Sequence, residues 1–269
     1  MAILNLTPDS FSDGGKHSPS TTQIVQTVRD MVSNGAHIID IGGQSTRPDA
    51  IEVSTQEEID RVVPAIQSIR QQGITVPISI DTYRAKVAEA AIGAGADIIN
   101  DVSAGQLDAD MLSTTAKLKV PIILMHMRGT PVTMTSLAKY DGDLIETIGQ
   151  ELAARVQEAA HAGIHRWNIL LDPGLGFAKT GTQNLEIMRR LAELRRQPGL
   201  SGIPWVLGPS RKRFIEGITG EKVAAERIFG TAGAVSACVQ GGADIVRVHD
   251  VAEMCKITKM SDAIWRNVS

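Results

Sequence analysis

The chain has 269 residues, 43% of them hydrophobic and 21% charged, a composition typical of a globular protein with a sizeable core. Its formal net charge of -3 excludes the broadly basic surface of a general nucleic-acid binder, but is compatible with a local anion site. No apolar run approaches the roughly 18 residues needed to cross a bilayer, so we expect no membrane segment. The two cysteines, Cys238 and Cys255, have no metal-ligand spacing and indicate buried thiols in a reducing compartment.

Short apolar runs alternate with amphipathic stretches along the whole chain. The runs predict strands at 2–6, 37–41, 77–81, 97–101, 120–126, 168–172, 203–208 and 243–248. The stretches predict helices at 20–34, 55–72, 84–94, 108–118, 143–162, 183–196, 222–240 and 251–266. Strict alternation calls for a parallel sheet, and eight units favour a closed (β/α)₈ TIM barrel over an open Rossmann sheet. No linker interrupts the pattern, so we predict one domain spanning 1–269.

A weak internal repeat supports this reading. Residues 35–40, 95–100 and 242–247 each begin with Gly-Ala, continue with a β-branched run and end on a polar residue. Glycine suits the left-handed cap that ends a helix, and the apolar run suits a strand buried on both faces.

Polar side chains stand at or just beyond the end of every predicted strand. They are Asn5, Asp40, Asp81, Asn100, Asp101, His126, Asp172, Lys212, Arg247 and His249. Any one of them could be a capping or turn residue. Because barrel active sites form at the carboxyl ends of the strands, the set predicts a site for a polar heterocycle with an anionic tail.

The basic residues near the last two strands predict where the anion binds. Ser210 is followed by Arg211, Lys212 and Arg213, and Arg247 and His249 close the chain's last strand. Loops after strands seven and eight of barrels often hold phosphate, although a basic triplet alone can be a solvated face.

Two glycine-rich loops carry groups that could meet a ligand. Residues 7–15 follow the first predicted strand and include Phe11, and residues 42–48 follow the second. Either could be an inert connector, but loops over a barrel mouth commonly act as lids.

These segments together resemble the dihydropteroate synthases. The matching blocks, in order, are 4–15, 40–48, 81–84, 99–103, 124–127, 172–177, 210–212 and 247–249. The resemblance spans essentially the whole chain. It implies an enzyme that condenses 6-hydroxymethyl-7,8-dihydropterin pyrophosphate with p-aminobenzoate, giving 7,8-dihydropteroate and pyrophosphate.

The resemblance also implies a role for each matching residue. The pterin would be bound by Asp81, Asn100, Met125, Asp172, Phe177 and Lys212. The p-aminobenzoate would lie against Phe11, Thr46, Arg47, Pro48, Phe177 and Ser210, and the pyrophosphate against Asn5, Arg47, Arg247 and His249. Mg²⁺ would bridge the pyrophosphate oxygens, with Asn5 as its protein ligand. Asp81, Asp172, Lys212 and Arg247 would carry the catalysis.

Departures from the usual bacterial pattern point to a fungal type of chain. Gln44 stands where bacterial members usually have Glu, and Ala178 where they often have Gly. Such resemblance implies fusion to other folate-pathway domains, which would explain a chain whose first strand has no lead-in. It also implies a homodimer, inhibition by sulfonamides, and a cytoplasmic or mitochondrial location without secretion.

Two other interpretations stay open. A methyltetrahydrofolate-dependent methyltransferase domain shares a pterin-binding barrel, but has no use for a pyrophosphate site at Arg247 and His249. A non-catalytic pterin-binding domain would have no need of the intact anion-site and loop residues.

Overall fold

The computed structural model describes residues 1–7, 20–45 and 52–266. Four residues expected to bind substrate lie outside these ranges: Phe11, Thr46, Arg47 and Pro48. No described helix is both long enough and apolar enough to cross a membrane.

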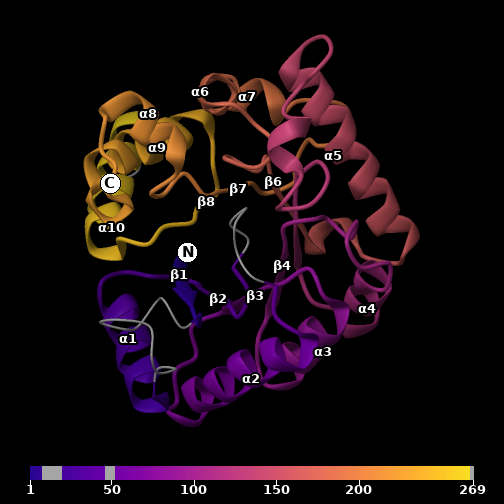
Figure 1. Cartoon of the computed structure of the whole chain (residues 1–269), viewed down its shortest axis with the longest axis vertical. Helices are drawn as coiled ribbons and strands as arrows, with labels where there is room; N and C mark the ends of the chain where they lie inside the picture. The colour runs from indigo at the N-terminus through magenta and orange to yellow at the C-terminus, as the bar shows by residue number, and fades with distance from the viewer. Residues whose placement is uncertain (8–19, 46–51, 267–269) are drawn as a thin grey trace.

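Parallel strands form the wall of a barrel, as the alternation in the sequence predicts. Within the described residues they are β1 (Ala2–Asn5), β2 (Ile39–Gly42), β3 (Ile78–Asp81), β4 (Ile98–Asp101), β5 (Ile122–Met125), β6 (Ile169–Asp172), β7 (Val206–Leu207) and β8 (Ile245–Val246). Strands β1 to β6 pair in chain order, and β7 pairs with β8. Single bridges join Leu171 to Trp205 and Ala2 to Val248, which closes the ring at both gaps. The predicted (β/α)₈ barrel is confirmed, with the strands inside a ring of helices (Figure 1).

The helices follow the predicted order. They are α1 (Thr21–Ser33), α2 (Thr55–Gln71), α3 (Ala85–Gly93), α4 (Met111–Leu118), α5 (Leu144–His161), α6 (Gly181–Arg189), α7 (Leu191–Leu194), α8 (Arg213–Thr219), α9 (Ile228–Gly241) and α10 (Val251–Trp265), with 3₁₀ turns η2 (Met134–Leu137), η3 (Arg166–Asn168) and η4 (Ala224–Glu226). Ser20 and Thr180 each form a capping box with a glutamine three residues later, which fixes where α1 and α6 begin.

Two predicted helices were wrong in extent. The helix predicted at 183–196 breaks at Arg190, whose backbone (φ -107°, ψ 20°) leaves the helical region between α6 and α7. The segment predicted as one helix at 222–240 contains the 3₁₀ turn η4 and then the helix α9, which begins only at Ile228. Arg227 is buried there and donates to the carbonyls of Glu221 and Lys222, so that segment forms η4. Helix α8 was not predicted, because seven residues give little periodic signal.

The repeat glycines adopt the conformation that the sequence predicts. Gly35, Gly95 and Gly242 have φ values of +98°, +113° and +101°, in the left-handed region that favours glycine. A Cβ on Gly35 would also stand 2.6 Å from the sulfur of Cys255, so this helix end packs closely against α10.

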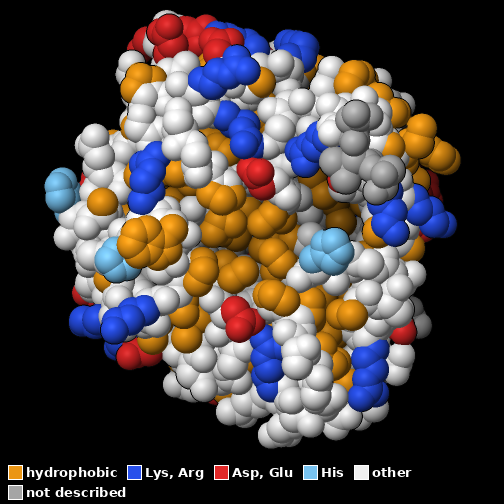
Figure 2. Space-filling model, turned by 180° about the vertical axis from the view of Figure 1, so that it is seen from behind, with side chains coloured by type: hydrophobic (Ala, Val, Ile, Leu, Met, Phe, Trp, Pro, Cys, Tyr) orange, Lys and Arg blue, Asp and Glu red, His pale blue; other side chains and the backbone are white. Residues whose placement is uncertain are grey.

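Most strand residues that face the barrel's core are apolar, although Asp40 and Ser79 are buried inside β2 and β3. All four residues of β2, β3 and β5 are buried, as in parallel strands covered on both faces. On the face opposite to that of Figure 1, hydrophobic side chains gather at the centre within a rim of charged and polar ones (Figure 2). That face therefore presents an apolar centre, whereas the predicted polar site residues gather at the carboxyl ends of the strands.

Candidate active site

A pocket at the carboxyl ends of the strands brings the predicted pterin-binding residues together. It is lined by Asp81, Asn100, Val102, Met125, Asp172, Leu175, Phe177, Gly208, Lys212 and Arg247. These residues come from β3, β4, β5 and β6 and from the segments around the ends of β7 and β8. A wider groove between the starts of α3 and α4 contains none of the predicted residues that the structure describes. The barrel mouth, rather than that groove, is the candidate site.

Arg247 lies between two buried carboxylates at the base of this pocket. Its Nε donates to Asp40 Oδ2 at 2.6 Å, and its Nη2 donates to Asp81 Oδ2 at 2.7 Å. Burial opposes the charge, but Asp40 and Asp81 raise the pKa of Arg247 above its ordinary value. The arginine is thus a fixed cation held in one orientation.

Asp81 keeps one oxygen for a ligand. Its Oδ1 is buried and has no hydrogen-bond partner among the residues that the structure describes. A buried acceptor left unpaired costs free energy that an N–H donor of a ligand would recover. Burial raises the pKa of Asp81 to about 7, while Arg247 acts in the opposite direction. The carboxyl group can therefore accept a hydrogen bond or hold a proton near neutral pH.

Asn100 is oriented by Asp40. Its Nδ2 donates to Asp40 Oδ1 and Oδ2 at 3.3 and 3.2 Å. Because a carboxylate only accepts, the amide nitrogen must face Asp40, and the amide oxygen is presented elsewhere. Val102 and Met125 lie beside it in a small apolar cluster against which Phe177 packs. The pocket thus joins polar groups to an apolar surface suited to a flat ring.

Asp172 ends β6 and organises the loop that follows. Its Oδ1 accepts from the backbone N–H of Gly174 at 2.7 Å, and burial raises its pKa. Position 174 requires glycine, because its φ is +69° and a Cβ would lie 2.0 Å from the carbonyl oxygen of His126. One carboxylate oxygen therefore holds the loop, and the second is the candidate acceptor for a ligand.

Phe177 and Lys212 face each other at the pocket wall. The Lys212 Nζ lies 4.3 Å from the centroid of the Phe177 ring, within cation–π range. Gly176, at φ +79°, lets the lysine stem pass, since a Cβ there would stand 3.0 Å from Lys212 Cδ. Burial lowers the pKa of Lys212 to about 8, with Arg247 adding to the effect. The ammonium group is a donor next to Asp172.

Of the basic triplet, Lys212 lines the pocket and Arg211 does not. Arg211 pairs with Asp250, with its Nε donating to Asp250 Oδ2 at 3.0 Å. Its φ of +61° and the bond from its N–H to Thr231 Oγ1 turn the chain so that the next side chain enters the site. The sequence could not separate these roles, because all three residues of the triplet are basic and the turn decides which of them enters the site.

Ser210 and His249 form a pair near the predicted anion site. The backbone N–H of His249 donates to Ser210 Oγ at 3.2 Å, and the same hydroxyl lies 3.0 Å from Nδ1 of the His249 ring. Burial lowers the pKa of His249 to about 3, with Arg211 and Arg247 contributing, so the ring is neutral. If the hydroxyl donates to Nδ1, the tautomer carries its proton on Nε2 and can donate to an anion. Ser210 is buried at 3% exposure and orients His249, and its expected contact with p-aminobenzoate stays a prediction.

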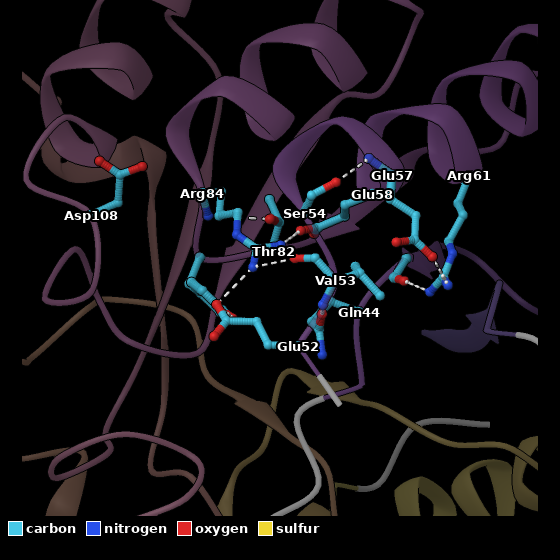
Figure 3. Close-up of polar contacts among 12 residues, drawn as sticks. Gln44, Glu52, Val53, Ser54, Glu57, Glu58, Arg61, Thr82, Arg84 and Asp108 are labelled. Carbon is cyan, nitrogen blue, oxygen red and sulfur yellow. Dashed lines mark hydrogen bonds and ion pairs between the residues drawn. The ribbon is translucent and has the colours of Figure 1, made fainter. Parts of the chain in front are cut away.

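A network of ion pairs and hydrogen bonds holds Glu52 and Val53, which precede α2 (Figure 3). Arg84 pairs with Glu58, and its Nη2 donates to Glu52 Oε1 at 2.7 Å and to the Val53 carbonyl at 2.8 Å. Gln44, which follows β2, accepts with its Oε1 from the Val53 N–H at 2.8 Å. The described residues on either side of the segment that carries Thr46, Arg47 and Pro48 are therefore tied to each other and to Arg84 at the start of α3.

From the sequence, Asp40 was predicted only as a polar residue at a strand end, without a role of its own. A signal was present, because a carboxylate inside the apolar run of β2 needs a buried cation. Arg247 directly follows β8, and its pairing with Asp40 across 207 positions required the closed barrel.

Comparison with known proteins shows a consistent likeness. The model of the pterin binding enzyme family matches residues 1–249. The folic acid synthesis protein fol1 of Pneumocystis carinii is 53% identical over 268 residues, which are 100% of this chain but 36% of that protein. The dihydropteroate synthase of Synechocystis is 51% identical over 99% of this chain and 90% of its own length.

A solved structure has the same fold. The dihydropteroate synthase of Yersinia pestis, determined with a sulfonamide drug, superposes with a TM-score of 0.91 and 38% identity. The match covers 99% of this chain and 94% of that one. The chain thus spans little more than a third of the fungal relative, but nearly all of the bacterial ones.

Proposed function

The chain belongs to the pterin-binding enzyme family, and from this premise we propose that it is a dihydropteroate synthase domain. It would join 6-hydroxymethyl-7,8-dihydropterin pyrophosphate to p-aminobenzoate and release pyrophosphate. The observation that carries the proposal is the unpaired buried oxygen of Asp81 in a pocket that also presents Asn100, Asp172 and Lys212. The Synechocystis relative, which bears this name, supports it.

The polar groups of the pocket complement a pterin. The 2-amino-4-oxo edge of the ring offers adjacent N–H donors, which the second oxygen of Asp172 would accept. Asp81 Oδ1 and the amide oxygen of Asn100 would take donors on neighbouring ring nitrogens. Lys212 would donate to the carbonyl oxygen and a ring nitrogen on the other side. The apolar faces of Met125 and Phe177 suit the flat ring.

The departing pyrophosphate would lie against Asn5, Arg247 and His249, with Arg47 also expected there. Arg247 is a fixed cation and His249 a neutral donor, so both can hydrogen bond to phosphate oxygens without a change of charge. In parallel barrels this end of strands seven and eight commonly takes phosphate.

Mg²⁺ is expected to accompany the pyrophosphate, with Asn5 as its protein ligand. The described part of the chain has no group of three or more His, Cys, Asp and Glu side chains that could hold a metal by themselves. The expected donors, the Asn5 side-chain oxygen and phosphate oxygens of the substrate, would suit Mg²⁺, which is commonly held by one or two protein oxygens and substrate phosphates. Asn5 Oδ1 lies beside Gly42, where a Cβ added to the glycine would stand 3.6 Å from this oxygen. The ion would neutralise charge on the leaving group.

The chain's own residues favour early departure of the pyrophosphate. The amine of p-aminobenzoate is the nucleophile, so no side chain needs to form a covalent intermediate. Loss of pyrophosphate leaves positive charge on a methylene conjugated with the dihydropterin ring. Asp81 and Asp172 would stabilise that charge in a partly desolvated pocket, while Arg247 holds the leaving group. We therefore expect the carbon–oxygen bond to break before the amine attacks.

The p-aminobenzoate would bind beside Phe177, with Phe11, Thr46, Pro48 and Arg47 expected from the two loops. Ser210 would contribute through His249, to which it is hydrogen bonded. Sulfonamides resemble p-aminobenzoate in size and charge, and are expected to compete with it. The sulfonamide complex of the Yersinia relative supports this expectation.

The decisive experiment is pyrophosphate release from the pterin pyrophosphate with and without p-aminobenzoate. Release that depends on p-aminobenzoate and yields dihydropteroate would establish the proposed reaction. Pterin binding without any release would instead identify a non-catalytic pterin-binding domain. Methyl transfer from methyltetrahydrofolate, without use of the pyrophosphate substrate, would identify the methyltransferase alternative.

The proposal extends to assembly and context. Exposed apolar side chains on α8, α9 and α10, namely Ile218, Phe229, Met260 and Ile264, supply a surface for a homodimer. Light scattering would report a mass of about twice the chain's 28.8 kDa. The fungal relative's much greater length supports fusion to other folate-pathway domains, for which a cytoplasmic or mitochondrial location is expected.

A further inference from the structure

Lys179 occupies an unusual position directly behind the pocket wall. Its half-buried side chain turns back along the loop, and Nζ donates to the carbonyl of Phe177 at 2.9 Å. The same Nζ lies 2.9 Å from His126 Nδ1 and 3.4 Å from the His126 carbonyl oxygen. One ammonium group thus ties the loop after β6 to the end of β5.

His126 connects this ammonium group to an outer ion pair. Its Nε2 lies 2.8 Å from Glu151 Oε2, and Glu151 in turn pairs with Arg128. Burial lowers the pKa of His126 to about 4, with Lys179 adding to the effect, so the ring is neutral near pH 7. Nδ1 of His126 then accepts from Lys179, and its Nε2–H donates to Glu151. Each of these two hydrogen bonds thus has one donor and one acceptor.

The neighbouring peptides of the loop have anchors of their own. The Gly176 N–H donates to Asn184 Oδ1 at 2.6 Å, and Tyr140 Oη donates to the Ala178 carbonyl at 3.0 Å. Lys179 holds the peptide carbonyl of Phe177 itself, between these two anchors. A change at Lys179 should therefore alter the ring's position without releasing the whole loop.

We propose that Lys179 is a positioning residue, which uses the His126–Glu151 chain to hold the Phe177 ring against Lys212 where p-aminobenzoate is bound. This inference rests on the proposed function, since it takes Phe177 as part of the p-aminobenzoate pocket. Lys179 does not touch the reacting atoms. It acts on substrate binding through the backbone of Phe177.

Titration of Lys179 offers a signature that simple structural support would lack. Burial lowers the pKa of Lys179 to about 7, opposed by Asp172 and Glu151 and assisted by Arg128 and Lys212. The charged form, which is the stronger donor, is present below that pH and is lost above it. Affinity for p-aminobenzoate should therefore decline as pH rises through about 7.

The test compares Lys179→Met with Lys179→Arg in steady-state assays. Loss of a hydrogen bond from a charged donor should raise KM for p-aminobenzoate roughly tenfold in Lys179→Met. KM for the pterin pyrophosphate should rise less, by no more than about threefold, because Asp81, Asn100 and Asp172 keep its polar contacts although Phe177 also packs on its ring. Lys179→Arg keeps a cationic donor, and should recover most of the loss and remove the decline near pH 7. Lys139→Met, an exposed lysine on a nearby segment, is the matched control and should resemble the wild type.

Hydrogen exchange of the loop tests the same inference without relying on activity. Backbone amides of residues 174–178 should exchange faster in Lys179→Met than in wild type or Lys139→Met, at a temperature where all three proteins are fully folded. Unchanged exchange, or equal rises in the two KM values, would overturn the positioning role. Absence of p-aminobenzoate-dependent turnover in the wild type would instead refute the proposed function, and faster exchange would still support the link between Lys179 and the loop.

Discussion

Replacement of Asp172 by asparagine separates the two tasks of that carboxylate. Its Oδ1 accepts from the Gly174 N–H at 2.7 Å and stabilises the loop, while the other oxygen is the proposed pterin acceptor. In Asp172→Asn the amide oxygen can keep the Gly174 bond, but the ligand-facing atom becomes an N–H₂ donor. Loss of one charge-assisted hydrogen bond costs about 1.5–3 kcal/mol. Pterin affinity should therefore fall by about 10- to 150-fold, since each 1.4 kcal/mol is a factor of ten.

Isothermal titration with the pterin substrate or pteroic acid measures this effect, and thermal unfolding reports the loop. Asp172→Ala should lose affinity to a similar degree and also lose about 1–3 kcal/mol of stability, because the Gly174 N–H is left unpaired. Asp101→Asn is the matched control. Asp101 is fully buried at the end of β4 and binds the N–H groups of Ser103 and Gly105, but does not line the pocket. If folded Asp172→Asn binds pterin as tightly as wild type, Asp172 is not the acceptor.

Three further predictions concern stability, pH and mechanism. Arg84→Met should destabilise the fold by about 3 kcal/mol or more, because it strands the buried Glu58, whereas Glu58→Gln should cost about 1 kcal/mol; urea unfolding yielding the reverse order would contradict the network. Burial raises the pKa of Asp101 to about 6 in the folded protein. The folded state therefore binds this proton more tightly than the unfolded state, which stabilises the protein below about pH 4. That stabilisation is lost as pH rises through 6. The stability of wild type relative to Asp101→Asn should therefore fall across that window, and parallel pH profiles would exclude the shift. Bridging and non-bridging oxygens of the pterin pyrophosphate should scramble without p-aminobenzoate and stop scrambling in Asp81→Ala; no scrambling in active enzyme, even with an unreactive analogue in the pocket, would favour direct displacement.

The sequence alone was sufficient to predict the barrel and most of the residues that line the pocket. Alternating apolar runs and amphipathic stretches suffice for the order of strands and helices, because parallel strands covered by helices are buried on both faces. Their carboxyl ends must share one face, so Asp81, Asn100, Asp172 and Lys212 could be placed together before any coordinates. The pocket lining confirms that these residues meet, although their contacts with substrate stay predictions.

Local pattern was less reliable where long-range contacts decide the backbone. Helical periodicity runs through Arg190, but its guanidinium binds Asp143, Glu186 and Glu193, and the helix breaks there. Arg227 similarly takes carbonyl groups that a continuous helix would have used. Periodicity reports which face is apolar and does not report such competing partners.

Only the tertiary structure decided which polar groups are partners and which remain for a ligand. Arg247 stays a predicted anion-binding residue, but only closure of the barrel shows that Asp40 and Asp81 hold its guanidinium in place. Ser210 turned out to orient His249, and the ties from Lys179 to Phe177 and His126 had no counterpart in sequence spacing. The physical reason is that side-chain types and strand order follow from local chemistry, whereas hydrogen-bond partners depend on distances of a few tenths of an ångström across the closed barrel.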